Sequence, residues 1–306
     1  NLDGAVAPEV VEDDRIAILD GADRLAVFGN DEFRQILVDG AGVRGTQAVD
    51  RLGGIGELRA LAEQANLQRL LHIGGTILDL RFRSFVGDYE LPTQTGLTIG
   101  EYARYIRHYL KLDLDLHVAP LTGWSRGMYL DDTDLPWVAP SPNCQSLATA
   151  LVYIGTCVFE GVNVSEGRGT TQPFELIGSP WINAAALEKR MALLNMPGLH
   201  FRRASFKPTF SKYQNELCHG VQVHITDREK ADVFLGGLKL LETIRDMYPE
   251  KLEYLSWGES RIHSLDKLLG TDAFRAGRLT ADEVSQTYAP GVAAFSEAVK
   301  PFLLYQ

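Results

Sequence analysis

The sequence predicts an α/β protein, because short apolar segments alternate along it with amphipathic helical patterns. Residues 14–19 and 24–28 are apolar runs bounded by glycines, as expected of buried strands. Residues 113–118 alternate polar and apolar side chains, and residues 199–210 and 218–225 are also strand-like. Because the early strands are separated by helices, we expect them to form a parallel sheet.

Helix starts are marked by capping residues. Thr98 with Glu101, and Thr280 with Glu283, form capping boxes in which the threonine is the N-cap. Pro290 is expected to interrupt the last helix. The helical patterns cover about residues 31–38, 57–64, 99–110, 184–195, 228–247 and 281 onward.

The composition limits the classes of partner. With 306 residues the chain is long enough for two domains, and its formal net charge of -10 argues against nucleic acids and anionic membranes, which attract clustered basic residues. No run of about 18 apolar residues is present, so no transmembrane segment is expected. The sequence begins at Asn1 and contains no signal peptide, as expected of a processed or trimmed product.

The cysteines Cys144, Cys157 and Cys218 show no CxxC spacing. An odd number without that spacing favours three buried thiols over a disulfide scaffold or a zinc site, with one disulfide plus a free thiol as the alternative. The sequence therefore predicts no metal centre.

Residues 163–174, NVSEGRGTTQPF, place a carboxylate, a guanidinium and three hydroxyls around two glycines. Gly167 and Gly169 allow backbone angles that other residues avoid and let another group approach the chain. Glu166 and Arg168 in such a setting are typical of a functional loop. The alternative is a surface turn in which these two side chains only pair with each other.

Gly40, Gly42 and Gly45 match the G-x-G-x-x-G pattern of dinucleotide-binding loops. That pattern binds pyrophosphate when it follows a strand and opens a helix. Residues 31–38 have a helical pattern instead, and the segment after Gly45 is soon broken by glycines, so an ordinary loop is favoured over a nucleotide site.

Residues 120–143 form a long irregular connection, of the kind that is usually functional or joins domains. Trp124 and Trp137 lie in it beside carboxylates, which indicates a carbohydrate surface, because indole rings stack on sugar faces. Anchoring of this loop to the core by the same rings is the alternative.

Several motifs follow one another along the chain: RFRSFVG (81–87), TIGE (98–101), PSPN (140–143), TALVYIGTCVFEG (149–161), NVSEGRGTT (163–171), PFELIG (173–178), FKP (206–208), KY (212–213) and LLGTD (268–272). In this order they resemble the exo-β-N-acetylmuramidase family from about residue 78 to the C-terminus. The resemblance implies a bacterial, exported glycoside hydrolase of cell-wall recycling that uses no cofactor. It would release terminal N-acetylmuramic acid from the non-reducing ends of peptidoglycan fragments.

The resemblance also implies a Rossmann-like domain followed by a second α/β domain, with the site in the cleft between them. We place a shortened and divergent Rossmann-like domain at residues 1–122, and the second α/β domain, which carries the NVSEGRGT loop, at residues 123–306.

In such an enzyme Glu166 is a catalytic carboxylate, and Arg168 is expected to bind the lactyl carboxylate that distinguishes muramic acid from glucosamine. The G-P-E-H-G segment of the family, which carries a further catalytic candidate, is not found in this sequence. Residues 28–32 begin in a similar way, which leaves Asp31 or Glu32 as a substitute. The residues expected to bind the sugar are Asn143, Asn163, Ser165, Arg168, Thr170, Trp124, Gln222 and His224.

Two other functions stay open on the sequence. One is a catalytically inactive protein that keeps the sugar pocket but lacks the second carboxylate, and the other is a nucleotide-binding enzyme that uses the glycine pattern at residues 40–45. For a hydrolase, retention or inversion depends on the separation of the two carboxyl groups, which a sequence does not give.

Overall fold

The structure is a computed structural model, and it describes residues 15–19, 26–27, 36–37, 72–113, 115–257 and 261–306. Its strands are β1 (Arg15–Leu19), β2 (Ala26–Val27), β3 (Ile36–Leu37), β4 (Gly74–Ile77), β5 (Pro92–Gln94), β6 (Asp115–Ala119), β7 (Leu176–Ser179), β8 (Leu199–Phe206) and β9 (Cys218–Ile225). Its helices are α3 (Ile99–Tyr109), α4 (Leu147–Thr156), α5 (Ala184–Leu193), α6 (Val233–Met247), α7 (Ser264–Leu269) and α8 (Ala281–Val299), with short 3-10 segments η1 (Leu80–Phe82), η2 (Leu130–Asp132), η3 (Cys157–Gly161) and η4 (Lys300–Phe302). The mixed succession confirms the α/β class.

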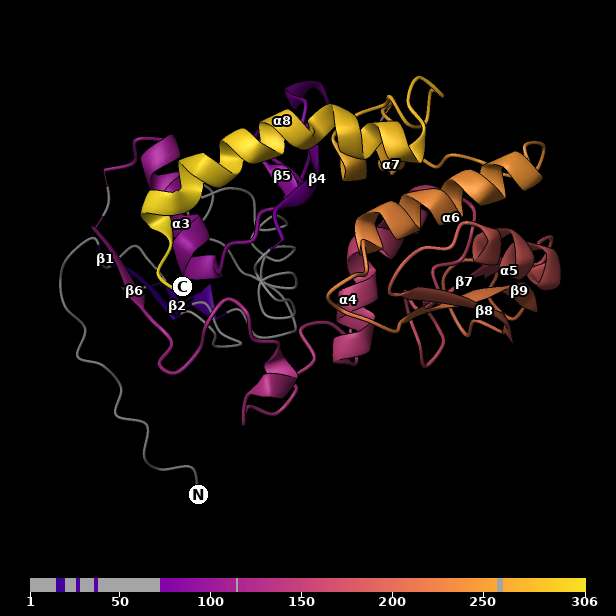
Figure 1. Cartoon of the computed structure of the whole chain (residues 1–306), viewed down its shortest axis with the longest axis horizontal. Helices are drawn as coiled ribbons and strands as arrows, with labels where there is room; N and C mark the ends of the chain where they lie inside the picture. The colour runs from indigo at the N-terminus through magenta and orange to yellow at the C-terminus, as the bar shows by residue number, and fades with distance from the viewer. Residues whose placement is uncertain (1–14, 20–25, 28–35, 38–71, 114, 258–260) are drawn as a thin grey trace.

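Figure 1 shows two groups of elements joined by a long helix. One group contains α3, β1 and β6, and the other contains α4, α5, α6 and the sheet of β7, β8 and β9. α8 extends from one group to the other and packs against β4, α6 and η4.

The first strands only partly follow the predicted parallel arrangement. β1 pairs in parallel with β6, in register from Arg15–Asp115 to Leu19–Ala119. The pairs β2–β3 and β4–β5 are antiparallel. The helix predicted over residues 31–38 is wrong at Ile36–Leu37, which form β3. Two adjacent apolar residues are compatible with the spacing of a helix and with that of a strand, and pairing with β2 satisfies their backbone hydrogen-bonding groups.

Because a strand and not a helix precedes the glycine pattern at residues 40–45, one argument against a nucleotide loop no longer holds. The glycines themselves, and the helix expected over residues 57–64, lie outside the described residues.

The capping box predicted before α3 is present, and its acid has a second role. Thr98 accepts a hydrogen bond from the backbone N–H of Glu101, whose Oε2 accepts from the N–H of Thr98 at 2.9 Å. The same Oε2 pairs with Arg126 at 2.5 Å, and Oε1 accepts from the N–H of Leu304 at 2.7 Å. One buried carboxylate thus ties the start of α3 to the irregular connection and to the C-terminal segment.

The sheet of the second group has the order β7-β9-β8 and is antiparallel throughout. The caps Asn183 before α5 and Thr280 before α8 are confirmed. α6 starts later than predicted, because Asp232 caps it at the N–H of Leu235. α8 is continuous through Pro290, contrary to the prediction; the ring lies on the exposed side, where water can hydrate the backbone carbonyl left without a donor.

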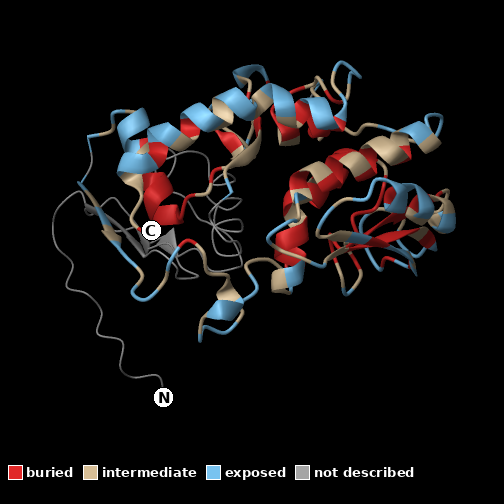
Figure 2. Cartoon of the chain, viewed as in Figure 1, coloured by how far each residue is buried: buried red, intermediate tan, exposed pale blue. Residues whose placement is uncertain are grey.

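The main core lies between α4, α6 and the three-stranded sheet, where the buried residues gather in Figure 2. Glycines allow α4 and α6 to touch through their backbones. A Cβ on Gly155 would lie 1.9 Å from the carbonyl oxygen of Val233, and one on Gly237 would lie 1.8 Å from that of Gly155. This crossing fixes the C-terminal end of α4, from which η3 and the loop at residues 163–174 continue.

All three cysteines are free thiols; Cys144 and Cys218 are buried, as the sequence favoured, whereas Cys157 is half-buried at the edge of a cavity. Burial raises the pKa of Cys157 to about 12 and that of Cys218 to about 11. Within the part of the chain that the structure describes, no helix is long and apolar enough to cross a membrane.

Candidate functional site

The loop at residues 163–174, here called the site loop, is folded back on itself against β7. Ser165 pairs with Gly178 through both backbone groups, at 2.8 and 3.0 Å. Gly167 and Gly169 have φ values of 78° and 83°, in the left-handed region that favours glycine. A Cβ on Gly169 would lie 2.6 Å from the carbonyl oxygen of Phe210, so the close approach predicted for these glycines is made by the chain itself.

Glu166 lies at the centre of this loop with its side chain 3% exposed. Its Oε2 accepts a hydrogen bond from Nζ of Lys212 at 2.8 Å, and its Oε1 is 3.2 Å from Nε of Arg168. A carboxylate removed from water needs such partners, because an unpaired buried charge is costly. The loop is therefore not the surface turn considered as an alternative, although the pairing of Glu166 with Arg168 does occur.

Arg168 bridges two carboxylates. Its guanidinium pairs with Glu160 as well as with Glu166 and lies over the ring of Phe174, 5.0 Å from the centroid. Burial alone would lower the pKa of Arg168, but the charge and hydrogen bond of Glu160 together with the charge of Glu166 outweigh it and raise that pKa. Phe174 has φ 63° and packs edge-on against Tyr153 of α4, at 4.6 Å between centroids. The guanidinium is thereby kept charged and fixed in direction.

Lys212 contacts Glu166 in the candidate site but was not singled out from the sequence. Its Nζ also donates to the carbonyl oxygens of Phe159 and Val164, at 2.6 and 3.2 Å. Its neighbour Tyr213 donates to the carbonyl oxygen of Asn163 at 2.6 Å. The segment between β8 and β9 therefore clamps the site loop over most of its length. The KY pair was part of the motif series, and this was the signal that could have identified it.

Three predicted sugar ligands use their polar groups within the fold. Ser165 Oγ accepts from the N–H of Gly167 at 3.1 Å, and Thr170 Oγ1 donates to the carbonyl oxygen of Gly167 at 2.7 Å. Asn163 donates to the carbonyl oxygen of Lys251 at 2.9 Å and accepts from the N–H of Glu253 at 2.8 Å. These contacts shape the loop and attach it to the segment after α6.

Gln222 and His224 lie on β9, on the strand face predicted for them. Gln222 is buried and accepts from Arg202 at 2.5 Å while donating to Glu175 at 3.3 Å. Glu175 also accepts from Thr149 at 2.7 Å. Burial lowers the pKa of His224, and the charge of Arg202 adds to this effect. This polar network adjoins the site loop through Glu175, and none of these hydrogen bonds involves Glu166 or Arg168.

The remaining predicted residues are placed as follows. Asn143 is half-buried, with its N–H donating to Ser141 Oγ at 3.3 Å. Trp124 packs edge-on against Tyr305 at 4.9 Å, and Trp137 packs against the small cluster of Cys144 and Ala150, so both indoles anchor the irregular connection. The catalytic candidates Asp31 and Glu32 lie outside the described residues.

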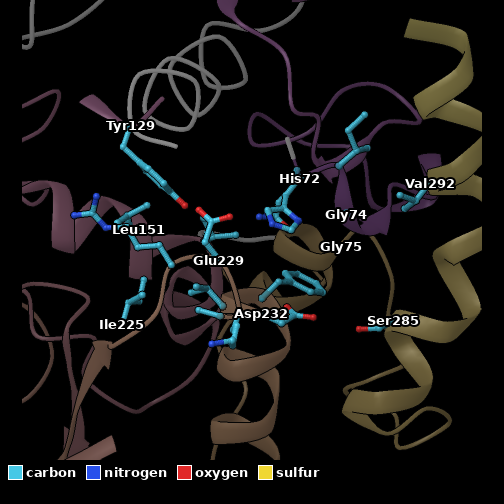
Figure 3. Close-up of a pocket in the computed structure, with 18 of the residues that line it drawn as sticks. His72, Gly74, Gly75, Tyr129, Leu151, Ile225, Glu229, Asp232, Ser285 and Val292 are labelled. Atoms are coloured by element: carbon cyan, nitrogen blue, oxygen red, sulfur yellow. The ribbon is translucent and has the colours of Figure 1, made fainter. Parts of the chain in front are cut away.

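Two cavities lie near α4. One of about 130 Å³ is lined by Tyr153, Cys157 and Glu160 together with residues of β5 and α7. A larger one of about 330 Å³ lies between β4, α4, α8 and the start of α6, and Tyr129, His72 and Glu229 point into it in Figure 3. Neither cavity is lined by a residue of the site loop itself. The smaller one is lined by Glu160, which pairs with Arg168 of the site loop, so we assign the candidate site to the smaller cavity and the charged groups beside it. In the described residues no cluster of His, Cys, Asp and Glu could hold a metal ion.

The chain matches two models of one family. The model of the C-terminal domain of exo-β-N-acetylmuramidase NamZ matches residues 151–305, and that of the N-terminal domain matches residues 62–148. The peptidoglycan β-N-acetylmuramidase NamZ of Bacillus subtilis (strain 168) is 44% identical over 246 residues, which cover 79% of this chain and 58% of that protein. The chain thus spans under two thirds of the length of this relative.

Solved structures agree with this assignment. One protein of the DUF1343 family from Bacteroides fragilis NCTC 9343 is 28% identical, with a TM-score of 0.70 over 77% of this chain and 63% of that chain. Another from the same strain is 30% identical, with a TM-score of 0.58 over 78% of this chain and 64% of that chain. The domain boundary at residue 122 stays a prediction. The chain belongs to the exo-β-N-acetylmuramidase family.

Proposed function

We propose that this chain is a glycoside hydrolase that removes terminal N-acetylmuramic acid from the non-reducing ends of peptidoglycan fragments. The proposal rests on one observation above all, the buried carboxylate of Glu166 held by two cations in the motif that carries the family resemblance. The relative from Bacillus subtilis is a peptidoglycan β-N-acetylmuramidase, which supports the same substrate class. Such a substrate would suit an exported enzyme of cell-wall recycling.

Glycosidases commonly use one ionised and one protonated carboxyl group. Both oxygens of Glu166 are already engaged by cations, Lys212 and Arg168, so we assign Glu166 the role of the charge-stabilising carboxylate and not that of the proton donor. For the proton donor we keep Asp31 or Glu32, the acids of the segment that begins like the missing family motif.

A chromogenic β-N-acetylmuramide tests the proposal. We expect the full chain to release the chromophore and Glu166→Gln to lose at least about 100-fold in kcat, because the amide cannot stabilise developing positive charge. Glu297→Gln, at an exposed glutamate near the end of α8 that pairs with Lys300, is the matched control and should keep wild-type rates. Equal rates for both variants would exclude Glu166 from catalysis.

A second candidate function is a sugar-binding protein without activity. It is favoured by the engagement of both other carboxylates near the loop. Glu160 pairs with Arg168, and Glu175 accepts hydrogen bonds from Thr149 and Gln222. Saccharide binding without chromophore release, in the wild type and in Glu166→Gln alike, would establish this second function.

A further inference from the structure

Lys267 of α7 is a cation beside the candidate site whose charge has no acidic partner among the described residues. It lines the cavity of about 130 Å³ together with Glu160. Its Nζ lies 5.8 Å from the ring centroid of Trp257, and no carboxylate of the described residues is within ion-pair distance. A half-buried ammonium with only an aromatic ring for a partner can still gain from an anion.

Arg168 differs from Lys267 in this respect. Its guanidinium already pairs with both Glu160 and Glu166, and Glu166 is also paired with Lys212. Two cations and two carboxylates therefore balance in this cluster. An anionic substituent approaching Arg168 would have to compete with two fixed carboxylates, whereas at Lys267 it would meet a cation that is not so engaged. The role given to Arg168 from the sequence is better filled by Lys267.

The size of the cavity limits what it can hold. Sites that hold a whole small molecule measure roughly 300–1,000 Å³. The volume of about 130 Å³ is below this range. The cavity therefore fits a short substituent of a sugar better than a whole sugar ring. Glu160 in its wall does not repel an anion strongly, because Arg168 neutralises it.

The rim of the cavity offers a surface for the ring itself. Phe85 precedes the cavity-lining Val86 and is 66% exposed. Its ring lies 5.6 Å from that of Trp257, the residue that Lys267 contacts. Trp257 is half-buried, so the two rings together form a contiguous apolar surface at the rim, and exposed apolar patches can mark ligand-binding grooves. A sugar resting on these rings would place a substituent towards Lys267.

We propose that Lys267 binds the carboxylate of the lactyl substituent of muramic acid in this cavity and so determines the preference for muramic acid over glucosamine. This inference rests on the proposed function, because the carboxylate belongs to the proposed substrate. It assigns the selectivity to α7 and leaves Glu166, Arg168 and Lys212 to the reaction centre.

Matched ligands test the role of Lys267. Dissociation constants of N-acetylmuramic acid and of its neutral methyl ester are measured by ligand-observed NMR on the full chain. We expect the acid to bind about tenfold more tightly than the ester, as one charge-assisted hydrogen bond provides. In Lys267→Met the acid and the ester should bind equally tightly, whereas Lys267→Arg should largely keep the tenfold preference for the acid. Lys300→Met removes an equal charge from a surface ion pair with Glu297 and should leave the ratio unchanged.

The outcomes separate this inference from the proposed function. If Lys267→Met keeps the tenfold ratio, or if Arg168→Lys abolishes it while Lys267→Met does not, the inference about Lys267 is wrong and the proposed function stands. If the wild-type chain neither binds the acid nor cleaves the chromogenic muramide, the proposed function fails and the inference falls with it. Thermal unfolding of each variant shows whether a lost ratio reflects a lost fold.

Discussion

Replacing Lys212 with methionine tests whether the site depends on the clamp between β8 and β9. Methionine keeps most of the apolar stem of lysine and removes the ammonium group. That group donates to Glu166 Oε2 at 2.8 Å and to the carbonyl oxygens of Phe159 and Val164 at 2.6 and 3.2 Å. The substitution therefore removes one donor from a buried carboxylate and from two carbonyls, of which that of Phe159 still accepts from the N–H of Val162 at 3.3 Å.

The expected loss can be estimated from these contacts. Removing one partner of a fully buried ion pair costs about 3–5 kcal/mol. Lys212 is 19% exposed, and Arg168 still contacts the other oxygen of Glu166, so we expect a smaller loss of about 2–3 kcal/mol in the free energy of unfolding. Adding Glu166→Gln removes the charge that was left unpaired. The double variant should therefore be more stable than the sum of the single losses predicts, by about 1–2 kcal/mol.

Urea unfolding followed by tryptophan fluorescence measures these differences. Lys189→Met is the matched control, because Lys189 is exposed on α5, and it should change the free energy by less than about 0.5 kcal/mol. A loss for Lys212→Met as small as that of the control, or a double-variant cycle with no coupling, would refute the view that Lys212 holds Glu166 in place.

Three further predictions follow from other features. Gly167→Ala should lower the free energy of unfolding more than the matched variant Gly277→Ala. Both glycines have positive φ, for which alanine costs about 1–2 kcal/mol, but only at Gly167 would a Cβ also lie 2.8 Å from a backbone oxygen. Equal losses of the two variants in urea unfolding would contradict this. Since the thiol pKa values are about 12 for Cys157 and about 11 for Cys218, Ellman's reagent at pH 8 should label both far more slowly in the folded chain than in urea, and similar rates would count against their burial. The folded-state pKa of His224 is lowered, so the unfolded chain binds more protons than the folded chain as the pH falls through the ordinary value near 6.5. The free energy of unfolding should therefore drop in that range, and His224→Gln should make this drop shallower. An unchanged pH dependence in His224→Gln would show that this histidine is not its cause.

Local signals predicted much of the fold correctly. The caps Thr98, Asn183 and Thr280 each act within three residues, so their patterns are complete in the sequence. Ile36–Leu37 were assigned wrongly because the partner that decides their conformation, β2, is not visible in a short window. Pro290 was predicted to interrupt the helix, but it lies on the exposed side of α8, where water can hydrate the carbonyl that lacks a donor. That exposure depends on how α8 packs, which a short stretch of sequence does not reveal.

The same distinction separates the site residues. Glu166 was identified because the glycines and the charged residues around it are adjacent in sequence. Its partner Lys212 lies 46 residues away, and only the fold brings the two together. Ser165 and Thr170 were chosen for the hydrogen-bonding capacity of their side chains. The structure shows that this capacity is used by the loop, since residues with short polar side chains satisfy backbone groups in turns.

The distribution of charge explains why a loop so rich in polar groups can still serve a substrate. Around the site loop, Arg168 and Lys212 balance Glu160 and Glu166, and the hydroxyls of Ser165 and Thr170 form hydrogen bonds with the backbone. Such a cluster is fixed in position before any ligand binds, as electrostatic stabilisation of a reaction requires. Recognition of an anionic sugar then needs a cation outside the balanced set. Lys267 meets that condition at the wall of the adjoining cavity, so recognition and reaction would be carried by different elements of the same fold.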